Sequence, residues 1–150
     1  MNHLHAFLET HRRIALDTSV FIYQLEANAR YAPLTDAVFS RLERPGVSAV
    51  TSTITMTELL VQPYRKSEEG RVDEIFALLS TYPNLDWIAP NLEIAEIAAR
   101  LRALHRLRTP DAIEAATAAH CGATGLITND AVFERVGAFE TLVLERLKIR

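Results

Sequence analysis

The sequence predicts an α/β fold: a single domain in which a central, mainly parallel sheet of about five strands is flanked by helices. Short apolar runs alternate along the chain with longer segments whose apolar residues recur at helical spacing. This alternation is typical of βαβ units, whose helices cover both faces of a parallel sheet. The chain has 150 residues, of which 49% are hydrophobic and 23% charged. These values are in the range of one globular domain with a real core.

Strands are expected where a short apolar run is bounded by polar or turn-forming residues. The first such run, Ile-Ala-Leu-Asp, ends in an acid and is typical of a buried strand. The expected strands are, in chain order, residues 14–17, 47–51, 85–89, 125–128 and 141–144. Helices between consecutive strands would make the sheet parallel.

Helices are expected between the strands, where apolar residues fall on one helical face. They are, in chain order, a short one around residues 20–25, one over 33–43, one from about Thr53 that stops before Pro63, one over 71–80, one capped by Asn91, one from Thr109 to Gly122, and a short one opened by Asn129-Asp130.

Residues at the helix ends support this assignment. Asn91 is a good N-cap residue, and it precedes an apolar stripe that continues through Leu104. Thr109 supplies a capping hydroxyl, and Pro110 suits the first helical position. Gly122 suits the position just after a helix end.

Composition excludes several classes of protein. No apolar span is long enough for a transmembrane helix. The charges of the N-terminal segment follow its short apolar stretch, and no signal-peptide cleavage pattern is seen, so we expect a cytoplasmic protein. Cys121 is the single cysteine, which excludes an intrachain disulfide and a thiolate metal cluster. The net charge of −3 gives no overall attraction to nucleic acid, so any such contact must be local and basic.

Four acidic residues carry the functional hypothesis: Asp17, Glu58, Asp111 and Asp130. Each is expected at a strand end or in a first helical turn, and acids at the carboxyl ends of parallel strands meet at one crevice. A cluster of carboxylates is unfavourable unless a cation neutralises it, and hard oxygen ligands suit Mg²⁺ or Mn²⁺. The pattern therefore predicts a metal-dependent enzyme that acts on a phosphodiester.

Each acid also has a simpler interpretation. Asp17 could cap a helix, Glu58 could be an exposed helical residue, and Asp111 is favoured by the helix dipole without any metal. Asp130 could be an N-cap, although Asn129 could take that role and free it.

Neighbouring polar residues are open to similar alternatives. Thr18 and Ser19 could cap the following helix or bind a phosphate, and capping is favoured. Glu114, three residues after Asp111, is interpreted as solvated or salt-bridged. All five histidines are interpreted as structural or surface residues, because no His-Glu-x-x-His spacing occurs.

Four stretches resemble the motifs of the PIN domain family, in the order that the family has them. Residues 14–23 look like the opening of that domain, and residues 57–58 match its second acidic position. Residues 109–118 look like its third motif, and residues 127–130 followed by Phe133 look like its fourth. Each motif alone is weak, but the four together with this spacing are specific.

The nearest subgroup is similar to VapC-type toxins of toxin–antitoxin pairs. The resemblance implies a Mg²⁺- or Mn²⁺-dependent endoribonuclease that hydrolyses RNA, is often a homodimer, and is inhibited by an antitoxin whose tail covers the site. It implies that the four acids bind metal and catalyse cleavage, supported by Thr18, Ser19, Thr128 and Asn129. Residues 13–150 would form the PIN-like nuclease domain. Residues 1–12 precede its usual start and are interpreted as an N-terminal extension in a position to alter the dimer or the partner surface.

Candidate RNA contacts lie near the expected site. The basic candidates are Arg65, Lys66, Arg106 and Arg108. A solvated helix face explains them equally well. Tyr23 and Tyr64 could stack on a base, although core or interface packing is favoured for both. Tyr31, Leu34 and Phe39 look like exposed apolar residues and support the homodimer.

Three alternative functions remain open. A phosphotransferase of the haloacid dehalogenase type also begins with a strand and an aspartate, but it needs a second acid where this chain has Ser19. A PIN scaffold could bind RNA or protein without cutting, although the presence of all four acids argues against it. A PIN nuclease could also act outside any toxin pair.

Overall fold

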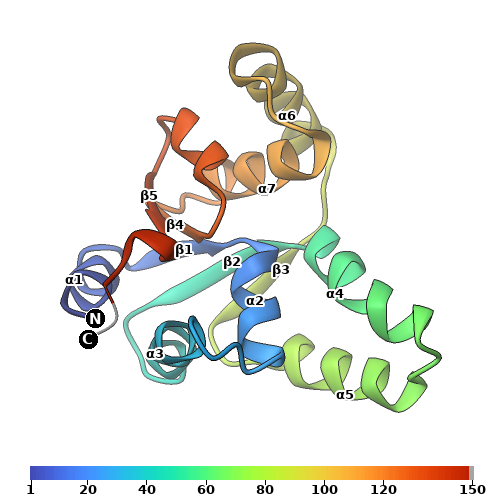
Figure 1. The fold of residues 1–150 in the computed structure, drawn as a ribbon. Helices are drawn as coiled ribbons and strands as arrows, with labels where there is room; N and C mark the ends of the chain where they lie inside the picture. Colours follow the sequence, from blue (N-terminus) through green and yellow to red (C-terminus); the bar gives the residue numbers. More distant parts are fainter. Residues whose placement is uncertain (149–150) are drawn as a thin grey trace.

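The α/β fold predicted from the sequence is confirmed. A computed structural model describes residues 1–148, and its centre is a five-stranded sheet in the order β3-β2-β1-β4-β5 (Figure 1). Every pair of neighbouring strands in it is parallel. The strands are β1 (Arg13–Leu16), β2 (Ser48–Ser52), β3 (Leu85–Ile88), β4 (Gly125–Thr128) and β5 (Glu140–Val143).

Helices connect the strands and cover both faces of the sheet. They are α1 (Asn2–Thr10), α2 (Thr18–Leu25), α3 (Ala32–Leu42), α4 (Thr53–Arg65), α5 (Glu69–Ser80), α6 (Leu92–His105), α7 (Thr109–His120), and the 3₁₀ helices η1 (Ala131–Arg135) and η2 (Leu144–Arg146). Among residues 1–148, no helix combines the length and the apolar character that crossing a bilayer requires.

Alternate residues of each strand point into two separate cores. Ile14 and Leu16 of β1 pack with side chains of α2, α3 and α5, whereas Ala15 between them packs with side chains of α6 and α7. Figure 1 shows α6 and α7 on one side of the sheet and α2, α3 and α5 on the other. This burial on both faces explains why the strands read as short, wholly apolar runs.

The strand order creates a crevice at the carboxyl end of β1. The chain moves outward from β1 to β2 and β3, and then crosses to the other side of β1 to form β4 and β5. Loops that leave β1 and β4 therefore turn in opposite directions, and ligands of open α/β sheets bind at such a point. Asp17 directly follows β1, and Asp130 follows β4 by two residues.

Three details of the helices differ from the expectation. Helix α4 continues through Pro63 to Arg65, because proline removes only its own N–H donor and the next turn bonds normally, with Lys66 N donating to Gln62 O. Thr109 does not cap α7, since it already belongs to the helix and the extended residue before it is the N-cap. Leu104 is 68% exposed and leaves the apolar stripe of α6.

The first helix, α1, was not expected from the sequence, and it is part of the core. Leu4, Phe7 and Leu8 of α1 are at most 3% exposed, and they join the cluster on the α2 and α3 side of the sheet. Gly125 of β4 leaves space for this helix, because a Cβ added there would lie 2.5 Å from the Phe7 ring. Residues 1–12 therefore pack as one body with the rest of the domain. Their influence on a dimer or partner surface stays a prediction.

His11 ties the end of α1 to the far strands of the sheet. Its Nδ1 lies 2.8 Å from Thr124 Oγ1, and its Nε2 lies 2.6 Å from Glu140 Oε2. This agrees with a structural role for this histidine.

The apolar residues that were expected to support a dimer are buried within the chain. Tyr31, Leu34 and Phe39 are 8%, 0% and 3% exposed. They face inward because α3 packs this face against α2 and the sheet. The idea that they form an exposed dimer surface is therefore wrong.

Candidate active site

Asp17 lies at the tip of β1 and is oriented by two hydroxyls. It occupies the N-cap position of α2, yet its side chain makes no capping hydrogen bond. Instead its Oδ2 accepts hydrogen bonds from Thr128 Oγ1 at 2.8 Å and from Ser19 Oγ at 3.2 Å. Burial raises the pKa of Asp17 to about 6, although these hydrogen bonds lower it. Its carboxylate is thus held for a role other than capping.

Glu58 reaches the same end of the sheet from α4. It lies in the second turn of that helix, not in the first turn as expected. Its side chain is exposed to solvent. Its Oε1 accepts a 2.8 Å hydrogen bond from Thr18 Oγ1. The residue after Asp17 therefore links the acid of α4 to the acid of β1, and this is a different role from capping or binding a phosphate.

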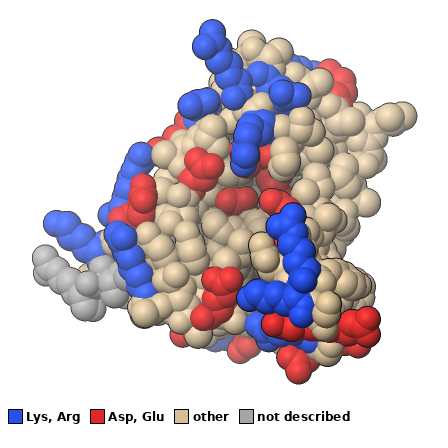
Figure 2. Space-filling model, turned by 45° about the vertical axis from the view of Figure 1, so that its right-hand side comes forward, with Lys and Arg blue, Asp and Glu red and all other residues tan. Residues whose placement is uncertain are grey.

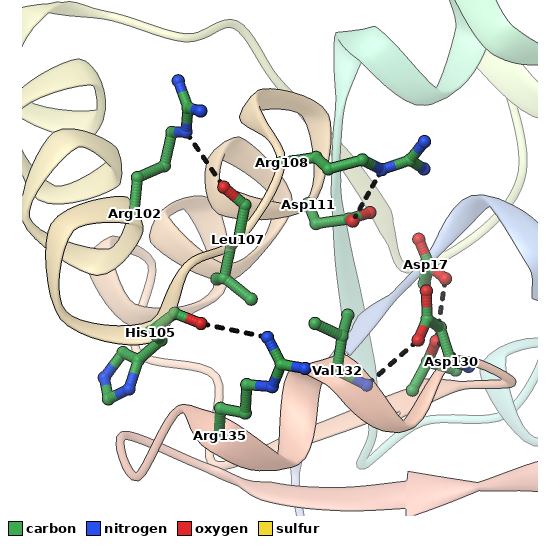
Figure 3. A network of polar contacts seen from close by, with 10 residues as sticks. Asp17, Arg102, His105, Leu107, Arg108, Asp111, Asp130, Val132 and Arg135 are labelled. Atoms are coloured by element: carbon green, nitrogen blue, oxygen red, sulfur yellow. Dashed lines mark hydrogen bonds and ion pairs between the residues drawn. The ribbon is translucent and has the colours of Figure 1, made fainter.

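Asp111 lies in the first turn of α7 and faces the other acids. Burial raises its pKa, the nearby Arg108 guanidinium lowers it, and Asp130 raises it again. Arg108 Nε lies 3.6 Å from Asp111 Oδ2. Figure 3 shows the carboxylates of Asp111, Asp17 and Asp130 directed toward one region from three different elements.

Asp130 does cap the short helix η1. Its Oδ1 accepts a 3.0 Å hydrogen bond from Val132 N. Asn129 does not take over this role, because its amide donates to Tyr23 Oη at 2.8 Å and its Oδ1 accepts from Glu145 N at 2.8 Å. The idea that Asn129 would free Asp130 is therefore wrong. The two partners that hold the Asn129 side chain, Tyr23 and Glu145, are 106 and 16 residues away in the sequence.

The oxygen ligands available at the carboxyl ends of the strands are of the type that a hard divalent cation prefers. Asp17, Glu58, Asp111 and Asp130 supply carboxylate oxygens, which Mg²⁺ and Mn²⁺ prefer. Within residues 1–148, however, no three acidic, histidine or cysteine side chains are close enough around one point to hold an ion as they stand. Metal binding at this edge would therefore need the carboxylates to draw together.

Glu114 was missed as a residue of this region. It was expected to be solvated or salt-bridged, but it is 4% exposed, and its Oε1 lies 2.5 Å from Thr55 Oγ1. Burial, together with the charges of Asp17 and Glu58, raises the pKa of Glu114 to about 8. The available signal was its setting, because Glu114 stands among small apolar residues that make α7 buried almost all round.

Basic side chains surround an acidic centre on one face. Figure 2 shows acidic side chains in the middle of this face, with Lys and Arg side chains around them. All four basic candidates are exposed, and only Arg108 is paired with a site acid. Tyr64 is 62% exposed, so it does not pack in the core, and a role in an interface stays a prediction. Tyr23 is packed as expected, since its ring stacks on Tyr31 with centroids 4.5 Å apart.

Two further arginines hold the loop that carries Arg106 and Arg108. Arg102 Nε donates to Leu107 O at 2.9 Å, and Arg135 Nη1 donates to His105 O at 3.1 Å (Figure 3). Arg106 ends α6 with a left-handed backbone, φ +55°. The loop between α6 and α7 is thus fixed from both sides next to Asp111.

Comparisons with known proteins give one family and one fold. A family model described as PIN domain matches residues 14–138. Among solved structures, VapBC2 from Rickettsia felis bound to a promoter DNA fragment has a TM-score of 0.67 and 15% identity, over 87% of this chain and 98% of that one. No curated protein matches the chain in sequence.

Two other solved structures are similar. A toxin–antitoxin complex from Klebsiella pneumoniae has a TM-score of 0.63 and 24% identity, over 87% of this chain and 96% of that one. Mycobacterium tuberculosis VapC20, described as a toxin that cleaves the sarcin–ricin loop, has a TM-score of 0.66 and 18% identity, over 83% and 95%. At these identities the likeness shows a shared fold.

Proposed function

The chain belongs to the PIN domain family, and we propose that it is a metal-dependent endoribonuclease that hydrolyses RNA phosphodiester bonds. One observation carries the proposal. Asp17, Asp111 and Asp130 come from three separate elements and face one region at the carboxyl edge of the sheet, where Thr18 also holds Glu58. Carboxylates that converge on one region repel one another, and within residues 1–148 only Asp111 of the four is paired with a basic side chain, so their convergence favours a cation-binding role.

The four acids would hold Mg²⁺ or Mn²⁺. A bound cation of this kind lowers the pKa of water and stabilises the charge that develops on a phosphate. Asp17 is held by Thr128 and Ser19 and would be the central ligand. Asp130 has one oxygen committed to capping η1 and would contribute less.

The basic residues around the acids would hold the RNA backbone. Arg65, Lys66, Arg106 and Arg108 are exposed and keep positive charge at this face despite the net charge of −3. Arg108 is the nearest of them to a site acid, and it would move between Asp111 and a phosphate. Exposed Tyr64 is the better placed of the two tyrosines to stack on a base.

We also propose that the protein is the cytoplasmic toxin of a type II toxin–antitoxin pair. Support comes from solved structures of the same fold that are described as a toxin–antitoxin complex and as a toxin. An antitoxin partner and a homodimer are part of this proposal. The homodimer rests on the resemblance alone, because the apolar residues first chosen for it are buried. Light scattering at micromolar concentration tests it, and a monomer would contradict it.

The test of the nuclease is cleavage of a panel of structured RNAs, including a sarcin–ricin loop hairpin, with Mg²⁺, Mn²⁺ or chelator. We expect cleavage with metal by the wild type and none by Asp17→Asn. A matched control is Asp73→Asn, which changes an exposed acid of α5 and should cleave like wild type. Metal-stimulated cleavage by Asp17→Asn would remove the assignment of the reaction to this site.

The competing function is a PIN scaffold that binds RNA without cutting it. One observation favours it: in the described part of the chain, no three potential ligands already surround a single point. The same panel separates the two functions. RNA binding with neither cleavage nor Mn²⁺ binding would establish the scaffold.

A further inference from the structure

Glu114 is a buried acid to which the proposed function assigns no role. It lies in the middle of α7, on the side that packs against β2, and it contacts Thr55 in the first turn of α4. Its Oε2 is 3.5 Å from Ser52 N, and its Oε1 is 2.5 Å from Thr55 Oγ1. It has no basic partner among the ion pairs of the described residues. A buried acid of this kind is costly to retain, so its contacts are informative.

Buried hydroxyls connect Glu114 to Glu58. Thr55 Oγ1 lies 3.2 Å from Thr18 Oγ1, and Thr18 Oγ1 donates to Glu58 Oε1 at 2.8 Å. Thr18 and Thr55 are 6% and 0% exposed, so this path is shielded from solvent. A side branch runs from Thr55 to Thr51 Oγ1 at 2.9 Å.

The number of hydroxyl protons decides the direction of the chain. Thr18 uses its proton on Glu58, and Thr51 uses its proton on Leu16 O at 2.9 Å. If Thr55 gave its only proton to Glu114, both of its contacts with the other threonines would lack a hydrogen. A proton on Glu114, donated to Thr55, leaves the Thr55 proton free for Thr18 or Thr51. The network is therefore better satisfied when position 114 is a donor.

With a donor at position 114 and the Thr55 proton directed to Thr18, every hydrogen bond of the chain points the same way. Glu114 then donates to Thr55, Thr55 to Thr18, and Thr18 to Glu58. Hydrogen bonds aligned in series polarise and strengthen one another. The last of them ends on an exposed carboxylate, whose rotamer it restricts.

We propose that Glu114 is a positioning residue that fixes the carboxylate of Glu58 for metal binding through the hydroxyls of Thr55 and Thr18. This rests on the proposed function, since Glu58 is there a metal ligand. Groups that orient ligands in this way typically change metal affinity or activity by about 10–100-fold when they are lost.

The test compares variants that keep or remove the donor at position 114. Glu114→Gln keeps the shape, an N–H donor toward Thr55 and an oxygen acceptor. Glu114→Met has a similar length but no strong donor or acceptor. Both should fold, and Glu114→Met should have an equal or higher melting temperature in chelator, because a buried acid has been replaced by an apolar group.

Mn²⁺ affinity measured by calorimetry is the deciding readout. We expect Glu114→Met to weaken it by about 10-fold or more, and Glu114→Gln to stay within a few-fold of wild type. Thr55→Val breaks the same chain at another point and should weaken it similarly. Both changes interrupt the same path. The double variant should therefore bind Mn²⁺ no more weakly than the single variant with the lower affinity. RNA cleavage should regain its wild-type rate at saturating Mn²⁺, with an unchanged KM for RNA.

The outcomes separate this proposal from the proposed function. If the wild type cleaves, Asp17→Asn does not, and Glu114→Met binds Mn²⁺ like wild type, only the positioning role is overturned. If Glu114→Met does not fold, Thr55→Val decides in the same way. A wild type that neither binds Mn²⁺ nor cleaves RNA overturns both proposals. Equal losses in Glu114→Gln and Glu114→Met would also overturn the positioning role, since the donor would then not matter.

Discussion

The hydroxyl of Thr128, the last residue of β4, donates a 2.8 Å hydrogen bond to Oδ2 of Asp17, the first residue after β1. The same hydroxyl accepts a 2.9 Å hydrogen bond from Asp130 N. Thr128 is 0% exposed, so this link between two neighbouring strands is protected from water. The residue thus sets the positions of two of the site acids at once.

Thr128→Val should weaken Mn²⁺ binding while the fold is retained. Valine has the same shape as threonine but no hydroxyl, so Asp17 loses an orienting donor. We expect a loss of about 10–100-fold in Mn²⁺ affinity by calorimetry. Thr141→Val is the control. Thr141 lies in β5, and its hydroxyl donates to Phe133 O at 3.4 Å and to none of the four acids. Equal affinities in the two variants would contradict an orienting role for Thr128.

Asp17→Asn should stabilise the metal-free protein. The pKa of Asp17 is raised to about 6 from 3.8, so the folded state favours the protonated acid. The protonated Asp17 therefore contributes fully to the free energy of unfolding below pH 3.8, and this contribution is lost as the pH rises through 6. At neutral pH the effect is on the order of 3 kcal/mol, at about 1.4 kcal/mol for each pKa unit.

Melting curves in chelator and in Mn²⁺ check this prediction. In chelator at pH 7.5, Asp17→Asn should melt higher than wild type. The extra stability that Mn²⁺ gives to the wild type should be absent in the variant, because only the folded site binds the ion. Asp73→Asn again serves as the control. An equal Mn²⁺ response in wild type and Asp17→Asn would count against Asp17 as a ligand.

Glu114→Gln should change how stability depends on pH. Burial raises the pKa of Glu114 from 4.5 to about 8, and the charges of Asp17 and Glu58 also act to raise it. The wild type should therefore lose stability relative to Glu114→Gln as the pH rises from 5 to 9. Urea unfolding in chelator at several pH values measures the difference. Parallel stability curves would show that Glu114 does not titrate in this range.

Phe7→Ala should destabilise the fold by about 3–5 kcal/mol, the usual range for a buried phenylalanine. Phe7 is 3% exposed, and it packs α1 onto β4 beside Gly125. Thermal or urea unfolding measures the change. Phe76→Ala on α5 is the matched control, since Phe76 is 53% exposed and should change stability far less. Similar losses in both variants would mean that α1 is not held as described.

Arg108→Ala should weaken RNA binding without regard to sequence. Loss of one phosphate contact should lower the slope of log affinity against log salt by about one. Binding to an uncleavable RNA measures this. Arg44→Ala is the control. Arg44 is exposed in the loop before β2, at the amino ends of the strands, whereas the acids lie at the carboxyl ends.

Asp17→Asn should bind the same uncleavable RNA as well as wild type or better, since a negative charge near phosphate is gone. If Asp17→Asn also loses binding, the acids support RNA docking or the fold.

Local signals in the sequence were enough for the five strands and for most of the helices, although not for α1 (Asn2–Thr10), which was not expected. The five strands lie where apolar runs predicted them, within one or two residues. Asn91 caps α6 as expected, and its Oδ1 accepts from Ile94 N at 2.9 Å. Gly122 has φ +73° after α7. These features depend on residues within one helical turn or one strand, so the sequence alone reveals them.

Only the tertiary structure decided which side chains meet. The order of the strands places Asp17 and Asp130 on two sides of one crevice, and strand periodicity carries no information about that order. Glu114 is buried where α7 packs against β2, and its hydrogen-bond partner Thr55 comes from 59 residues earlier. Asn129 is drawn away from its expected cap by Tyr23, 106 residues earlier. Burial and hydrogen-bond partners are set by contacts between residues distant in sequence, and the local patterns of charge and hydropathy do not contain them.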